Sequence, residues 1–190
     1  MRILRASDHK RMPWKNGKGE TVEIAVFPEG ASVDTFDWRI SMAPVASDGP
    51  FSVFPGIDRT LSILTGDGMM LSVEGMAPRV LGQKTVPFSF PGDAKTEAVL
   101  QAGPITDLNV MTRRGHFSHR VMRVEQGGEI GFSADAAFVI LVVTGKAQVS
   151  QVELDPLDAV ILDDPAHSRD VRLETQEPCF VIEIFGLASR

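Results

Sequence analysis

Apolar residues occupy alternate positions in many short segments of this sequence, and turns rich in glycine and proline separate the segments. The segment 21–27 is an example, because it alternates and then stops at Pro28-Glu29-Gly30. A period of two is typical of a strand with one buried face. We find no amphipathic segment of ten or more residues with a helical period. The pattern predicts an all-β sandwich or barrel.

The expected strands cover most of the chain, with one short helical turn near residues 7–12. We place strands at residues 21–27, 38–43, 59–65, 69–74, 86–90, 107–113, 117–124, 138–143, 147–152, 158–162, 170–174 and 180–185.

The segment 48–68 is expected to organise the first half of the chain. Turn residues at 48–50 and 55–56 enclose an apolar clasp that includes Phe51 and Phe54. The strand that follows ends at Gly66-Asp67-Gly68, and we expect the next strand to pair with it across this turn.

A weak internal repeat divides the chain. Residues 59–66 resemble residues 138–145, because each segment is an apolar strand that ends in Thr-Gly. The two copies lie about 80 residues apart, a spacing that suits two fused jelly-roll barrels. We place the barrels at residues 1–115 and 116–190. The alternative is a chance match, since many β-proteins contain strand–glycine–strand segments.

Charge and cysteine content exclude several classes of function. The net charge of −6 disfavours nucleic-acid binding, which needs a basic face, and gives no attraction to an anionic membrane. The one cysteine, Cys179, cannot form an internal disulfide and fits a reducing compartment. The N-terminus lacks an apolar core of signal-peptide length, and no apolar run approaches membrane-helix length. We therefore expect a cytoplasmic protein.

The most unusual polar stretch is Pro13-Trp14-Lys15-Asn16-Gly17-Lys18-Gly19. Its glycines allow tight turns, Lys15 offers a charge, Asn16 offers an amide, and Trp14 offers a flat face. These properties suit a loop over an anionic or planar ligand. The alternative is a solvated turn in which Trp14 anchors the core.

Three arginines on expected strands form a second polar group: Arg39, Arg59 and Arg113. An arginine that points into a barrel needs a carboxylate, which either the protein or a ligand can supply. The candidate protein partners are Asp37, Asp58 and Asp107. An internal ion-pair network and a ligand clamp are both consistent with this pattern. Because arginine binds carboxylates bidentately, we expect any ligand to be a small acidic metabolite.

Metal and covalent chemistry have little support in the sequence. The histidines are His9, His116, His119 and His167, and none forms a His-X-His pair. We expect no metal and no cofactor, because a transition-metal site needs several convergent ligands. Cys179 opens an apolar run, which indicates a packed thiol rather than a nucleophile.

Six blocks carry a resemblance to a known family. They are PWKNG at 13–17, TVEI at 21–24, FDWRISMA at 36–43, DGPFS at 48–52, FPGIDR at 54–59 and DLNVMTRRG at 107–115. With these blocks the chain resembles the HutD/Ves family, with Lys18 at a position where the family usually has glycine. The resemblance implies a bicupin, which is two cupin-type barrels in one chain. It also implies a link to bacterial histidine utilisation or stress response, with no established catalysis.

The resemblance and the polar residues together predict a binding protein for a small acidic metabolite such as urocanate or formylglutamate, in a regulatory role. We expect the ligand-binding residues to be Trp14, Lys15, Asn16, Arg39, Phe51, Arg59, Asn109 and Arg113. One alternative is a metal-free enzyme that uses Glu23 or Asp58 as base. Another is a structural protein without a ligand. The strand 138–143 could also pair across a homodimer, since sheet edges invite pairing.

Overall fold

A computed structural model describes residues 1–14, 19–162 and 170–187, and these residues form strands and one short 3-10 helix, η1 (Ala6–Asp8). The all-β prediction is confirmed. The chain divides into two compact units, Lys10–Arg114 and a second unit made of Met1–His9 with Gly115–Arg190. In the described ranges, no helix has the length and hydropathy needed to cross a membrane.

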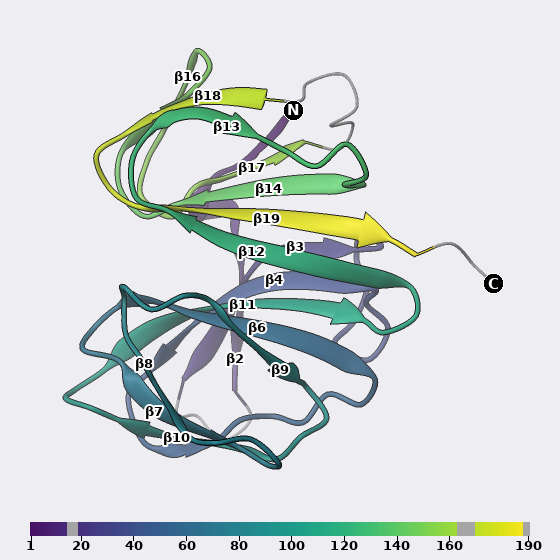
Figure 1. Cartoon of the computed structure of the whole chain (residues 1–190), viewed down its shortest axis with the longest axis vertical. Coiled ribbons are helices and arrows are strands. Elements are labelled where there is room, and N and C mark those ends of the chain that lie inside the picture. Colours follow the sequence, from purple (N-terminus) through teal and green to yellow (C-terminus); the bar gives the residue numbers. More distant parts are fainter. Residues whose placement is uncertain (15–18, 163–169, 188–190) are drawn as a thin grey trace. The chain divides into compact units, whose positions relative to one another are not determined.

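The Lys10–Arg114 unit consists of two antiparallel sheets that face each other (Figure 1). The larger sheet has the order β2 (Lys10–Pro13), β3 (Glu20–Phe27), β4 (Trp38–Val45), β11 (Ile105–Arg113), β6 (Ile57–Thr65) and β9 (Phe88–Pro91). The smaller sheet has the order β5 (Gly49–Pro50), β10 (Thr96–Leu100), β7 (Met69–Val73) and β8 (Arg79–Leu81).

The second unit also has two sheets. One has the order β1 (Arg2–Leu4), β17 (Ala159–Leu162), β14 (Phe138–Val143), β19 (Cys179–Gly186) and β12 (Phe117–Val124). The other has the order β13 (Gly128–Gly131), β18 (Asp170–Thr175), β15 (Ala147–Val149) and β16 (Val152–Leu154).

The two units repeat one topology. The order β4-β11-β6-β9 in the first unit corresponds to β12-β19-β14-β17 in the second, and β5-β10-β7-β8 corresponds to β13-β18-β15-β16. The strands of the weak sequence repeat, β6 and β14, occupy equivalent places in this order. The first nine residues depart from the expected division, because β1 pairs with β17 in the second unit rather than joining the first barrel.

The period of two decides which side chains enter each core. In β4, Trp38 and Ile40 point to one face, whereas Arg39 and Ser41 point to the other. The first unit's core combines Leu61 from one sheet with side chains of the other sheet, including Leu71 and Ala98. The second unit has an apolar core cluster that includes Val139, Leu141, Val143, Val160, Leu173 and Val181.

The expected hairpin across Gly66-Asp67-Gly68 is wrong. β6 pairs with β11 and β9, whereas β7 pairs with β10 and β8, so this turn carries the chain from one sheet to the other. Gly66 and Gly68 have φ values of +89° and +100°. A Cβ at Gly68 would lie 2.1 Å from the carbonyl oxygen of Leu81, so only glycine fits this crossing.

Two further expectations need correction. The segment 147–152 is not one strand, because a turn that contains Ser150 with φ of 57° separates β15 from β16. The strand 138–143 is not a sheet edge, because β14 lies between β17 and β19. Its backbone groups are therefore occupied, and it cannot pair across a homodimer.

A buried carboxylate, Asp158, binds the N-terminal segment to the rest of the second unit. Asp158 accepts hydrogen bonds from the Ala6 amide at 2.7 Å, from Arg5 Nη1 at 2.7 Å and from the Asp155 amide at 3.0 Å. These donors hold the pKa of Asp158 below its usual value, despite the opposing effect of burial. Each donor favours the ionised form, so this contact stabilises the fold only while Asp158 is charged.

We expect Asp158→Ala to lower the free energy of unfolding by about 2–3 kcal/mol near pH 7, because charge-assisted hydrogen bonds are lost and buried donors remain. A folded-state pKa below the unfolded value adds stability above the unfolded pKa and loses it as pH falls through the folded pKa. The deficit should therefore shrink below about pH 4. Urea denaturation at pH 7 and pH 3.5 measures both effects. The control is Asp155→Ala, an exposed carboxylate in the same turn; equal losses for the two variants would contradict this role.

Candidate ligand-binding pocket

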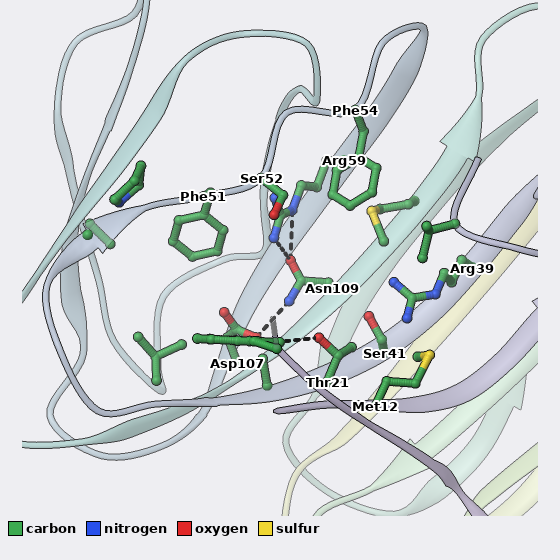
Figure 2. Close-up of a pocket in the computed structure, with 18 of the residues that line it drawn as sticks. Met12, Thr21, Arg39, Ser41, Phe51, Ser52, Phe54, Arg59, Asp107 and Asn109 are labelled. Carbon is green, nitrogen blue, oxygen red and sulfur yellow. Dashed lines mark hydrogen bonds between the residues drawn. The ribbon is translucent and has the colours of Figure 1, made fainter. Parts of the chain in front are cut away.

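A cavity of about 710 Å³ lies inside the Lys10–Arg114 unit. Strands β4, β6 and β11 line one side, and the loop 51–54 lines another. Figure 2 shows polar side chains from these elements converging on the same space. The volume falls in the range of small-molecule sites, which are about 300–1,000 Å³.

The inward faces of three adjacent strands supply the polar groups. Arg39 and Ser41 come from β4, Arg59 comes from β6, and Asp107 and Asn109 come from β11. β11 lies between the other two strands, with Asn109 opposite Ser41 on one side and opposite Leu61 on the other. Alternation and register therefore bring together side chains that are far apart in the sequence.

A line of hydrogen bonds joins Arg59 to Asp107 through an amide. Arg59 donates from Nε to Asn109 Oδ1 at 2.7 Å and also donates from Nη2 to the same oxygen. Asn109 donates from Nδ2 to Asp107 Oδ1 at 2.6 Å (Figure 2). The Arg59 guanidinium also lies 4.6 Å from the ring centre of Phe51, a cation–π distance.

Burial changes the ionisation of both ends of this line. Burial raises the pKa of Asp107 to about 7, although the positive charge of Arg59 opposes the rise. Burial likewise lowers the pKa of Arg59 to about 10, with Asp107 acting in the opposite direction and Arg39 adding to the decrease. Arg59 therefore stays charged at neutral pH, whereas Asp107 is poised between its two forms.

Arg39 is held by a different partner. Its Nε lies 2.6 Å from Glu23 Oε2, and both side chains are less than one-tenth exposed. A shift in register between Glu23 and Ala25 interrupts the pairing of β3 with β4 near this contact. The pair is a buried ion pair whose guanidinium also lines the cavity.

Trp14 forms part of the wall. Its amide donates to the Gly19 carbonyl oxygen at 2.8 Å, and Nε1 donates to Thr21 Oγ1 at 2.9 Å. A Cβ at Gly19 would lie 2.8 Å from a ring carbon of Trp14, so glycine lets the ring lie against the backbone. Trp14 thus contributes an aromatic side chain to the cavity wall.

The structure brings together five of the eight expected ligand-binding residues: Trp14, Arg39, Phe51, Arg59 and Asn109 line the cavity. Lys15 and Asn16 lie outside the described residues. Arg113 does not line the cavity. It donates to the backbone oxygens of Phe36 at 2.9 Å and Asp34 at 3.1 Å, so it braces the loop before β4.

The three candidate carboxylate partners, Asp37, Asp58 and Asp107, contact arginines in different ways. Asp107 does act on Arg59, but through Asn109. Asp37 lies 3.8 Å from Arg113, and Asp58 pairs with Arg114 outside the cavity. Asp107 lines the cavity but is not among the eight expected ligand-binding residues. Asp107 and Asn109 are separated by the apolar Leu108, so they lie on the same face of the strand. This alternation could have identified Asp107 from the sequence.

The other candidate reactive groups, Glu23, Asp58 and Cys179, are not among the residues that line the cavity. Glu23 and Asp58, the two candidate bases, are each bonded to an arginine. Burial raises the pKa of the Cys179 thiol to about 12, which suits a packed thiol. In residues 1–14, 19–162 and 170–187, no three His, Cys, Asp or Glu side chains are arranged to hold a metal ion. His167 lies outside these ranges.

A model of the HutD family matches residues 6–181. The chain belongs to the HutD family. Protein Ves from Citrobacter koseri is 34% identical over 165 residues, which are 85% of this chain and 84% of that protein. An uncharacterized 21.2 kDa protein in the hutC 3' region of Pseudomonas putida is 33% identical over 150 residues, which are 79% and 77% of the two chains. The resemblance inferred from the six sequence blocks is confirmed.

Solved structures agree with this assignment. HutD from Pseudomonas fluorescens SBW25, determined in a formate condition, has a TM-score of 0.86 and 31% identity, with coverage of 98% of this chain and 99% of that one. Protein Ylba from E. coli has a TM-score of 0.67 at 8% identity, with coverage of 99% and 92%, and so shares the fold alone. Such neighbours are of the cupin type.

We expect Glu23→Ala to cost about 3 kcal/mol of unfolding free energy, because it leaves the buried Arg39 charge without its partner. Glu20→Ala is the matched control, since Glu20 lies on the same strand and pairs with Arg11 on the surface, where such a pair contributes about 1 kcal/mol or less. Guanidinium denaturation of both variants measures the difference. Similar costs for the two would show that the Arg39–Glu23 pair does not stabilise this barrel.

Proposed function

We propose that this HutD-family chain is a bicupin that binds a small acidic metabolite in the cavity of the Lys10–Arg114 unit. The role that we infer is regulatory rather than catalytic. Urocanate and formylglutamate are the candidate ligands, and the cytoplasm is the inferred compartment.

The observation that carries this proposal is the positive charge on the cavity wall. The Arg59 guanidinium is buried, and its direct hydrogen-bond partner is the uncharged Asn109 amide. A charge in a low-dielectric site attracts an anion more strongly than the same charge in water. Arg39 adds a second guanidinium on the same cavity, partly balanced by Glu23.

The rest of the lining suits a small organic acid. Phe51 and Trp14 supply apolar faces, while Ser41 and Thr21 supply hydroxyl groups. Ligand sites commonly combine apolar walls with a few placed polar groups that fix orientation. The choice of histidine-pathway acids is supported by the names of the relatives, HutD from P. fluorescens and the P. putida protein from the hutC region.

The bicupin arrangement is supported by the repeated strand order of the two units and by the cupin type of the fold neighbours. Such a repetition is expected after duplication of one barrel. The cavity that the buried Arg39 and Arg59 line lies in the first unit, so we assign the ligand to that unit.

We favour a regulatory role over catalysis because the two candidate bases, Glu23 and Asp58, already have partners. Each is engaged by an arginine, and Asp58 does not line the cavity. A structural protein without a ligand would need no cavity of this volume, because a void in a core costs stability.

A thermal-shift panel of urocanate, formylglutamate, glutamate and formate tests the proposal. A ligand at about 100 times its dissociation constant adds about 2.7 kcal/mol, which raises Tm by roughly 5–10 °C for a chain of this size. Arg59→Ala should weaken binding about 10- to 100-fold, because a charge-assisted contact is lost. Arg59→Lys should bind with intermediate affinity, since it keeps the charge without the planar fork.

The control for this test is Arg79→Ala, which removes the same charge from an exposed strand of the same unit, away from the cavity. It should bind like the unaltered protein. If no acid in the panel shifts Tm, while Arg39 and Arg59 variants only lose stability, the arginines brace the barrel and the proposal is wrong.

A further inference from the structure

Asp107 is a buried carboxyl group that lines the cavity and has no role in the binding proposal. It is 0% exposed, at the centre of the larger sheet. Its Oδ1 accepts the hydrogen bond from Asn109, whereas Oδ2 has no hydrogen-bond partner among the residues that the structure describes. A buried carboxylate oxygen without a donor is costly, and a proton on that oxygen removes much of the cost.

The charges around Asp107 can be followed strand by strand. β6 contributes Arg59, which reaches Asp107 through Asn109, and β4 contributes Arg39, which is paired with Glu23 of β3. Asp48, before β5, also lines the cavity, but it is exposed and accepts a hydrogen bond from the Leu100 amide. No histidine is among the described lining residues.

This set of charges makes the cavity's net charge depend on one proton. With Glu23 balancing Arg39, an ionised Asp107 balances Arg59, and the buried groups sum to zero. With Asp107 protonated, the positive charge of Arg59 is uncompensated. An anion would therefore meet an attractive cavity only when Asp107 is neutral.

We propose that this cavity binds a carboxylate ligand and a proton together, with Asp107 as the proton site. The inference rests on the proposed function. It adds that one carboxylate group of the ligand lies beside Arg59 and replaces the negative charge that Asp107 loses on protonation. Asn109 is the positioning residue, because its amide is hydrogen-bonded to both Arg59 and Asp107 and holds the two side chains in place. Arg59 is the residue that contacts the anion.

The physical reason is competition for one guanidinium. Burial already places the pKa of Asp107 near 7 with Arg59 as its main stabilising charge. An anion bound to Arg59 places a negative charge near Asp107 and also offsets the positive charge of the guanidinium. Both effects favour the protonated form of Asp107. Linkage then requires that protonation of Asp107 strengthen anion binding by the same factor. The proton comes from solvent and stays on Asp107 while the anion is bound.

The expected size of the pH effect on binding follows from the titration of Asp107 near pH 7 in the free protein. Formylglutamate and formate are useful probes, since their carboxylates remain ionised between pH 6 and pH 8. Binding should be about tenfold weaker at pH 8 than at pH 6. At pH 8 nearly one proton should be taken up per ligand bound. Calorimetry in two buffers of different ionisation enthalpy, such as phosphate and Tris, counts this proton directly.

Asp107→Asn removes the titrating group and keeps a neutral side chain of the same shape. We expect this variant to bind at pH 8 as tightly as the unaltered protein binds at pH 6, with no proton uptake and no dependence on buffer. Asp58→Asn is the matched control, because it makes the same change outside the cavity, and it should retain both the tenfold pH effect and the proton uptake.

The outcomes separate the two proposals. If a probe binds with the same affinity at pH 6 and pH 8 and takes up no proton, the anion site exists and the role of Asp107 is wrong. If neither probe binds at any pH, this inference fails, and if urocanate and glutamate also fail to bind, the proposed function fails with it. The buffer measurement uses the unaltered protein, so the inference stays testable even if Asp107→Asn does not fold.

Discussion

The hydrogen-bond line from Arg59 through Asn109 to Asp107 is the interaction on which the interior of the first unit depends. Three polar side chains inside a β-barrel would be costly if they were unpaired. Here each compensates the next, and Phe51 covers the guanidinium. The line lets the barrel keep charges and open space where a packed apolar core would otherwise form.

The second unit shows the alternative that the same topology allows. Its interior contains a cluster of packed apolar side chains such as Leu141 and Val181. Its buried carboxylate, Glu183, is bonded to Arg120 at 2.6 Å and to the Ser133 amide at 2.8 Å. Both oxygens of the Glu183 carboxylate therefore accept a hydrogen bond, one from a side chain and one from the backbone. One strand order therefore supports both a packed barrel and a barrel with a polar cavity, and the inward side chains decide which one forms.

Buried charge has a different consequence at each site. The Arg39–Glu23 contact pairs opposite charges directly. The donors around Asp158 favour the ionised form of that carboxylate. Asp107 has no cation as its direct partner, so burial dominates and its pKa rises. The distinction between a bracing carboxylate and a titrating one follows from this difference in partners, since all three residues are almost fully buried.

The sequence alone determined the strands with strong alternation and the family, because these depend on a local period of two or on motif identity. Tertiary structure decided that β6 and β7 belong to different sheets, that the first nine residues join the second unit, and that Arg113 lies away from the cavity. It also decided which partner each arginine takes. The physical reason is that register and burial arise from contacts between segments far apart in the chain, which no local pattern encodes.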